Sequence, residues 1–306
     1  MISSVDGRVT RSRRPSMQSR RKWIGFAFVV PATLFVLLFF ITPLAMSGFM
    51  SLNNWPLLGS RHFVGLDNYR AIKDDTQFWQ ALGFTLKYAA IATPVIFLVA
   101  LGLALLVRKN APGVGVFRTS FFIPVVLGLG ATSYLWVWLF NDQVGVFNNV
   151  LEGLGILQQP YEFLGDSTTS LISIVIMVVW KTAGFTMLLF VIGMQSIPED
   201  LFEAARVDGA GRWATLIKIT LPLLRRTFAL ALIVSVIGSI LAFDQFYIMT
   251  SGGPNNETLT AVYWIYNNGF TYYHLGYAAA LSMVLLVILL AISVVQLYLL
   301  RDSTQL

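Results

Sequence analysis

PEDLFEAARVDGAGRWATLIKITLP, residues 198–222, is a charge-dense segment in a chain that is almost continuously apolar on both sides of it. The proline followed by two acids at 198–200 is typical of a helix start, where free N–H groups favour negative charge and a proline costs nothing. Gly209 and Gly211 then interrupt the helical spacing. A second amphipathic piece follows, and Pro222 disallows its continuation as an uninterrupted helix. The segment is therefore predicted to form two short helices around a hinge.

The composition of the chain is that of an integral membrane protein. Hydrophobic residues make up 56% and charged residues 12% of the 306, and the mean hydropathy is +0.71, whereas soluble domains carry about 25% charged residues. The net charge of +6 comes from Lys and Arg clusters beside the apolar runs, so no nucleic-acid partner is predicted. With no Cys and two His, Cys-based zinc or redox sites are excluded and a His-based metal site is disfavoured.

Six apolar runs are long enough to cross a membrane as helices. The predicted spans are residues 23–47, 82–107, 121–140, 171–193, 228–248 and 277–300. The first run exceeds the roughly 7–15 apolar residues of a secretory signal, so it is predicted to be retained. Pro124 predicts a kink in the third run, and Trp136 and Trp138 mark its end as interface aromatics. The fold is therefore predicted to be all-α, with one transmembrane domain at residues 23–300.

Lys and Arg gather on one side of the predicted spans. They cluster in residues 1–22, 108–118 and 196–226, and Arg301 follows the last span. Because Lys and Arg near span ends resist translocation, this side is predicted to be cytoplasmic. Residues 1–22 contain too few large apolar side chains to fold alone and are predicted to be a disordered basic tail. Both termini, including residues 301–306, and the loop at 196–226 are therefore predicted to be cytoplasmic.

The loop resembles the EAA signature of the membrane subunits of binding-protein-dependent ABC importers, in their carbohydrate-uptake branch. The matching positions, with their spacing kept, are Glu203, Ala204, Ala205, Gly209, Ile219, Leu221 and Pro222. The alternative is an ordinary amphipathic loop between spans. The resemblance covers about residues 23–300 and implies a six-span, MetI-like permease similar to the first permease of maltose- and glycerol-phosphate-type systems. The chain lacks the extra N-terminal spans and large external domain of the maltose-system member.

The resemblance also implies partners. They are a second, homologous permease, a dimer of ATP-binding subunits, an extracytoplasmic solute-binding protein, membrane lipid and a carbohydrate substrate, in a prokaryotic inner membrane. No segment reads G-x-x-x-x-G-K-[ST], so this chain cannot bind nucleotide by the P-loop route. ATP and Mg²⁺ are therefore expected on the separate ATPase. No cofactor and no enzymatic activity are expected in this chain.

In the family that the loop resembles, its first helix sits in a groove on the ATPase and moves with it. Small residues and Gly209 permit close approach, and the charged side chains offer polar contacts. The predicted ATPase-coupling residues are Glu203, Ala204, Ala205, Arg206, Asp208, Gly209, Ala210, Leu221 and Pro222.

Polar residues inside the predicted spans are candidate solute contacts, because ionisable groups are costly there. Lys181 lies about 14 residues from the inner end of its span, hence roughly 20 Å deep. It either snorkels toward the outer surface or contacts a solute or partner. The predicted pathway residues are Trp180, Lys181, Phe185, Ser235, Ser239, Asp244 and Gln245. For the aromatics the alternative is packing, and for the four polar residues of the fifth run it is a cap or an inter-subunit hydrogen bond.

Four further interpretations stay open. The aromatic residues within 255–276, an expected external loop, are either an interface belt or a surface for a docking solute-binding protein. A glycerol-phosphate-type importer would use Lys181 to meet the anion. A secondary transporter should show internal repeats and paired interrupted helices, and a membrane scaffold should lack polar residues in its spans. No catalytic constellation is found.

Overall fold

The computed structural model describes residues 17–108 and 111–300, so most of the predicted basic tail and the predicted tail at 301–306 lie outside the described residues. The chain divides into two compact units, residues 1–49 and residues 50–306. Nearly all of the described secondary structure is helical, which confirms the predicted all-α class.

The first unit is one long helix with a π-helical turn in it. α1 (Met17–Val36) continues through η1 (Leu37–Ile41) into α2 (Thr42–Ser51). Thr42 Oγ1 donates to the Leu37 carbonyl at 2.8 Å, five residues back, which suits the wider turn. The stretch Phe28–Ser51 is long and apolar enough to cross a membrane. Because α1 begins at Met17, residues 17–22 are helical and not disordered as predicted.

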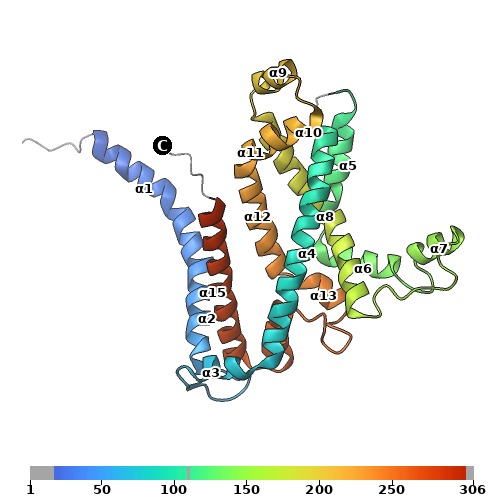
Figure 1. Ribbon diagram of the computed structural model, residues 1–306. Coiled ribbons are helices and arrows are strands. Elements are labelled where there is room, and N and C mark those ends of the chain that lie inside the picture. The colour runs from blue at the N-terminus through green and yellow to red at the C-terminus, as the bar shows by residue number, and fades with distance from the viewer. Residues whose placement is uncertain (1–16, 109–110, 301–306) are drawn as a thin grey trace, which may run out of the picture. The chain divides into compact units, whose positions relative to one another are not determined.

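The second unit is a helical bundle with a small hairpin near one end. Its elements in chain order are β1 (Asn53–Asn54), β2 (His62–Phe63), α3 (Asp67–Asp74), α4 (Thr76–Val107), α5 (Val114–Val126), α6 (Leu129–Leu139), α7 (Val146–Gly153), α8 (Ser167–Gln195), α9 (Glu199–Val207), α10 (Arg212–Thr215), η2 (Leu216–Thr220), α11 (Leu221–Leu223), α12 (Arg225–Ile240), α13 (Asp244–Met249), α14 (Ala261–Tyr266), η3 (Asn267–Thr271) and α15 (Leu275–Leu300). β1 and β2 pair antiparallel. α4 and α8 pack along each other, α5 lies against α8, and α12 lies between α4 and α15 (Figure 1).

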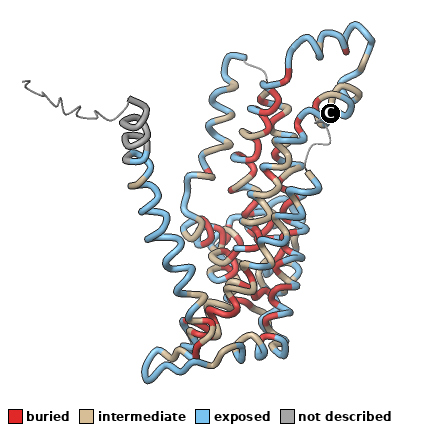
Figure 2. The backbone as a smooth tube through the Cα atoms, turned by 90° about the vertical axis from the view of Figure 1, so that its left-hand side faces the viewer, coloured by how far each residue is buried: buried red, intermediate tan, exposed pale blue. Residues whose placement is uncertain are grey.

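Buried residues follow the length of this bundle (Figure 2), and most of them are apolar. They form three main clusters, around Tyr88, Ile174 and Phe246, around Met187, Phe190 and Leu224, and around Phe78, Ile240 and Leu281. α4 contributes Ala92, Ala100 and Ala104, each fully buried. Small residues of this kind let two helices approach closely in a membrane. The central part of the bundle is therefore tightly packed.

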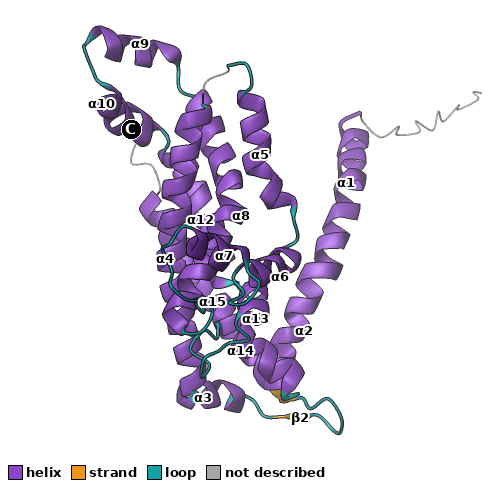
Figure 3. Cartoon of the chain, turned by 90° about the vertical axis from the view of Figure 1, so that its right-hand side faces the viewer, coloured by secondary structure: helices purple, strands orange, loops and turns teal. Residues whose placement is uncertain are grey.

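The third predicted span is broken and not simply kinked. α5 ends at Val126, α6 begins at Leu129, and their axes differ by 98°. Leu127 and Gly128 between them have extended backbones, with ψ of 140° and 138°. Two extended residues end a helix completely, whereas Pro124 alone would remove one hydrogen bond. Figure 3 shows α6 turning away from the direction of α5.

The fifth predicted span, residues 228–248, is not one helix either. α12 ends at Ile240 and α13 begins at Asp244. Thr260 Oγ1 donates to the Ala242 carbonyl at 2.8 Å and so satisfies a group that the break exposes. Within the described residues, four helices can cross a membrane by length and composition, or six if the bent pairs α5–α6 and α10–α12 each count as one span. The count of six agrees with the prediction.

Candidate functional site

The predicted coupling loop begins with a short helix that ends in a glycine cap. Gly209 has φ of +72°, in the left-handed region. Its N–H donates to the Arg206 carbonyl at 3.1 Å, and the Ala210 N–H donates to the Ala205 carbonyl at 2.8 Å. These two bonds form a Schellman motif, which satisfies carbonyls that the end of a helix leaves free. The prediction that glycine ends this helix is confirmed.

α9 has one face held by the bundle and one face exposed. Phe202 packs on the cluster around Met187 and Phe190, and the Arg108 guanidinium lies 5.8 Å from the centroid of its ring. Ala205 is buried, whereas Ala204 is exposed. Of the two predicted small contact residues, only Ala204 thus faces outward. The Glu203–Arg206 ion pair, at 3.4 Å, is on the surface and contributes little to stability.

The second part of the loop is formed by α10, η2 and α11. Its junction with α12 is anchored by Leu224, which is fully buried. Leu221 is half-buried and Pro222 exposed. The large exposed apolar side chains of the whole loop are Leu201, Val207, Trp213, Ile217 and Leu223, with Val207 87% exposed. Figure 1 shows α9 beyond the ends of α4 and α5, and α10 beside their upper ends. Exposed apolar residues gathered in this way mark an interaction surface.

Some of the predicted pathway residues lie around α6 and α13, two short helices that pack against each other. Trp180 of α8 is 40% exposed, and its ring centroid is 5.6 Å from that of Trp136 on α6. Gln245 of α13 is buried, with its Nε2 3.4 Å from the Tyr88 hydroxyl. Within the described residues its Oε1 has no hydrogen-bond partner. Asp244 beside it is half-buried.

The polar residues of the fifth run do not share one helix as predicted. Ser235 and Ser239 lie on α12, and Asp244 and Gln245 lie on α13, because the chain leaves the helix between Ile240 and Asp244. Ser239 is buried and Ser235 half-buried. Phe185 of α8 is 41% exposed. Among the described residues, no ring contact or hydrogen bond joins Phe185 or Ser235 to the residues around α6 and α13.

Lys181 lies at the break between α5 and α6. Its side chain is buried, with 9% of its surface exposed. Nζ donates to the Leu127 carbonyl and lies 3.4 Å from the carbonyl oxygens of Pro124 and Val125. The side chain is therefore directed into the protein, and the alternative that it snorkels to the outer surface is wrong. A contact with solute or partner stays a prediction.

The aromatic segment within residues 255–276 is largely helical and not an open loop. Tyr263 is buried, with its ring centroid 5.3 Å from that of Tyr247. Trp264 Nε1 and the Tyr277 hydroxyl donate to Asp75 Oδ2, at 2.9 and 2.7 Å. Asp75 also caps α4 by accepting from a backbone N–H. Part of the aromatic set therefore has a packing role, while Phe270, Tyr272 and Tyr273 are exposed.

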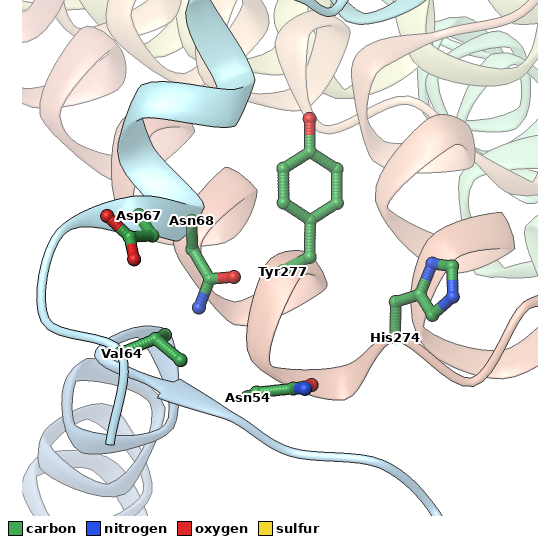
Figure 4. A pocket seen from close by; sticks show the side chains of 6 residues that line it. All are labelled: Asn54, Val64, Asp67, Asn68, His274 and Tyr277. Carbon is green, nitrogen blue, oxygen red and sulfur yellow. The ribbon is translucent and has the colours of Figure 1, made fainter. Parts of the chain in front are cut away.

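A shallow cavity of about 370 Å³ lies near the hairpin end of the bundle (Figure 4). It is lined by Asn54, Val64, Asp67, Asn68, His274 and Tyr277. Three of its polar side chains already have partners in the protein. Asp67 pairs with Arg70 at 2.9 Å, Asn68 donates to two backbone carbonyls, and the Tyr277 hydroxyl, which points away from the cavity in Figure 4, donates to Asp75. The cavity is therefore explained by the folding of this end of the chain.

Three residues at these sites were not predicted to belong to them. Tyr88 follows Lys87 in an otherwise apolar run, and Thr260 lies in a turn segment, so neither stands out by its residue type. Trp136 was predicted to be an interface aromatic. In the structure Trp136 is 6% exposed, so that prediction is wrong for Trp136, whereas Trp138 is exposed. The break between α5 and α6 lets α6 pack against α13, so that one side of α6, which carries Trp136, is buried.

The second unit is a bundle of membrane-length helices in which broken spans pack together and a two-part loop is exposed at one end. This is the architecture of the membrane subunit of a transporter. The chain belongs to the family of binding-protein-dependent transport system inner membrane components, which it matches over residues 77–303. The resemblance seen in the coupling loop is thereby confirmed, and so is a place in the inner membrane.

Relatives with known names match nearly the whole chain. The sulfoquinovosyl glycerol transport system permease protein SmoG of Agrobacterium fabrum is 33% identical over 282 residues, which are 92% of this chain and 91% of that protein. The trehalose/maltose transport system permease protein MalF of Thermococcus litoralis is 32% identical over 285 residues, 92% and 95% of the two chains. A chain in the crystal structure of a bacterial alginate ABC transporter, in complex with an alginate pentasaccharide-bound periplasmic protein, has the same fold. Its TM-score is 0.83 at 22% identity, over 96% of this chain and 99% of that one.

Proposed function

We propose that this chain is one of two permeases of an ABC importer for a carbohydrate, and that its α9 to α11 loop receives the motion of a separate ATPase. The observation that carries the coupling role is the construction of α9. The helix is capped at Gly209 and held on the bundle by Phe202, while Leu201 and Val207 remain exposed. A rigid element with a free apolar face can transmit a push from a partner to the long helices behind it.

The carbohydrate is supported by the relatives, whose names include sulfoquinovosyl glycerol, trehalose, maltose and lactose as transported compounds. The arrangement around α6 and α13 suits such a solute. Trp180 offers a partly exposed ring for stacking on a sugar, and Asp244 and Gln245 offer hydrogen-bonding groups. The second permease would supply the other half of this path. A solute-binding protein would deliver the sugar at the end of the bundle opposite α9.

A glycerol-phosphate-type importer is less well supported. Such an importer would need Lys181 to contact an anion inside the membrane. The Lys181 ammonium is already placed against three backbone carbonyls, and an ammonium has three donors in all. An anion would have to displace these contacts.

A crosslinking experiment tests the coupling role, because the chain contains no Cys and a single introduced thiol is therefore unique. Val207→Cys is suited to it, since Val207 is 87% exposed, whereas Ala205 is buried. In the assembled transporter we expect a thiol-specific crosslinker at position 207 to capture the ATPase subunit. The matched control is Leu58→Cys, equally exposed but in the β1–β2 hairpin, and it should capture no ATPase. Cysteines at the exposed positions Leu201 and Trp213 extend the test. If none of the three loop positions captures the ATPase, or if position 58 captures it, the docking role is refuted.

A second experiment tests the solute. Candidate sugars are added with their binding protein to the complex in proteoliposomes, and ATP hydrolysis is measured. Stimulation by a neutral or acidic oligosaccharide is expected. Stimulation by glycerol phosphate alone would overturn the carbohydrate assignment while leaving the coupling role in place.

A further inference from the structure

The break between α5 and α6 leaves backbone groups that need partners. The last carbonyls of a helix have no partner within it, and α5 ends inside the run predicted to cross the membrane. Leu127 and Gly128 are extended and do not continue the hydrogen-bond pattern. One local bond remains, from the Leu127 N–H to the Pro124 carbonyl at 3.3 Å. In a membrane, unpaired carbonyls are costly, so such a break requires donors from another part of the protein.

Lys181 supplies those donors from α8. Its Nζ donates to the Leu127 carbonyl and lies 3.4 Å from the carbonyls of Pro124 and Val125. A positive charge is also the electrostatic complement of the C-terminal end of a helix. No carboxylate of the described residues lies within ion-pair distance of Lys181. The carbonyl oxygens at the end of α5 are therefore what compensates this charge.

The contact between α8 and α5 is close at this point. A Cβ atom built on Gly184, three residues after Lys181, would lie 1.9 Å from the Phe121 carbonyl oxygen. α8 can thus lie directly on the backbone of α5, and the lysine next to this contact reaches the end of the helix. A similar arrangement occurs near the start of α5, where Arg118 donates to the Val107 carbonyl at the end of α4, at 3.0 and 2.6 Å.

We infer that Lys181 is a positioning residue, whose ammonium fixes the α5–α6 break and thereby the place of α6 beside α13. α6 carries Trp136, whose ring meets Trp180, and α6 packs on α13, which carries Asp244 and Gln245. The charge of Lys181 thus acts on the proposed pathway through the backbone of the break. It does not act by contact with the solute.

The inference is tested by measuring the place of α6 directly. Tyr134 on α6 and Ile172 on α8 are both more than half exposed, so spin labels on cysteines at these positions should not disturb the packing. The distance between the labels is measured by double electron–electron resonance in the full complex in nanodiscs. The variants are Lys181→Met, Lys181→Gln and Lys181→Arg. Thr182→Val is the matched control, since among residues 17–108 and 111–300 the Thr182 hydroxyl bonds only within α8, to the Val178 carbonyl.

We expect Lys181→Met to broaden or shift the distance distribution, Lys181→Gln to do so less, and Lys181→Arg to keep the original distribution, as should Thr182→Val. Binding-protein-stimulated ATP turnover of the Met variant should fall by about tenfold, the factor that about 1.4 kcal/mol of lost positioning would give. If Lys181→Met does not assemble, the Gln and Arg variants still decide the question, because Lys181→Gln should change the distance distribution more than Lys181→Arg does. An unchanged distance distribution in Lys181→Met or Lys181→Gln would overturn the inference. This readout needs no solute, so its failure is distinguishable from failure of the proposed function.

Discussion

Replacement of Gly209 should separate ATP hydrolysis from transport. Gly209 has φ of +72°, and a Cβ there would meet nothing within 4 Å, so the cost of Gly209→Ala is conformational and not steric. An L-residue in the left-handed region costs about 1–2 kcal/mol, which shifts the equilibrium of the cap by roughly 5- to 30-fold. Gly209→Pro is more severe. Proline fixes φ near −65° and removes the N–H that donates to Arg206, a bond worth about 1 kcal/mol.

Loss of this cap should fray the end of α9, because so short a helix is marginal by itself. Val207 and Leu201 would then no longer be held in one orientation. The assay is the ratio of solute uptake to phosphate release in proteoliposomes containing the whole transporter. Both variants should insert normally, since Gly209 lies outside the candidate spans, but the ratio should fall moderately in Gly209→Ala and nearly to zero in Gly209→Pro. Gly211→Ala is the matched control, because Gly211 has φ of −70° and open space around it. Normal coupling in Gly209→Pro would refute the reasoning.

Three further outcomes are expected. Gly184→Ala should lower the melting temperature or prevent assembly, because its Cβ would lie 1.9 Å from a backbone oxygen of α5 and overpacking costs about 1–3 kcal/mol or more. Gly102→Ala on α4, where a Cβ would meet nothing within 4 Å, should be tolerated. Equal melting temperatures of the two variants would contradict the close packing of α8 on α5. Asp244→Ala should raise the concentration of loaded binding protein needed for half-maximal uptake without changing assembly, and an unaltered uptake curve would give Asp244 a structural role only. Hydrogen bonds from Thr169 and Thr168 hold the pKa of Asp166, at the start of α8, below its ordinary value. The contribution of the Asp166 carboxylate to folding stability is therefore complete above about pH 4 and is lost as the pH falls through the lower folded-state pKa. The melting temperatures of the wild type and Asp166→Asn should thus converge on acidification, and a difference constant with pH would oppose this.

The sequence was sufficient for the features that depend on local pattern. Six apolar runs, the two-part loop at 196–226 and its glycine turn all follow from hydropathy, charge and residue type. The EAA-type spacing gave the family, which the match over residues 77–303 confirms. Each of these is visible within a window of about one helix length.

The breaks in the spans were not predictable in the same way. The break after α5 is satisfied by Lys181, and the break after α12 by Thr260. In both cases the donor lies on another element, so apolar periodicity continues through the break and suggests one helix. The same reasoning applies to Asp75, whose partners Trp264 and Tyr277 come from the other end of the chain. Long-range hydrogen bonds of this kind override local pattern.

The short helices α6 and α13 have a consequence for how a passage can widen. Each is joined to its long neighbour by only two or three residues outside any helix. The side chains that reach these joints, Lys181 at the first and Thr260 at the second, therefore hold the short helices in place. The long helices α4 and α8 can meanwhile keep their tight alanine-rich seam. If the proposed pathway runs beside α6 and α13, a change in these few contacts would be enough to widen it, and the long helices would not have to slide past each other.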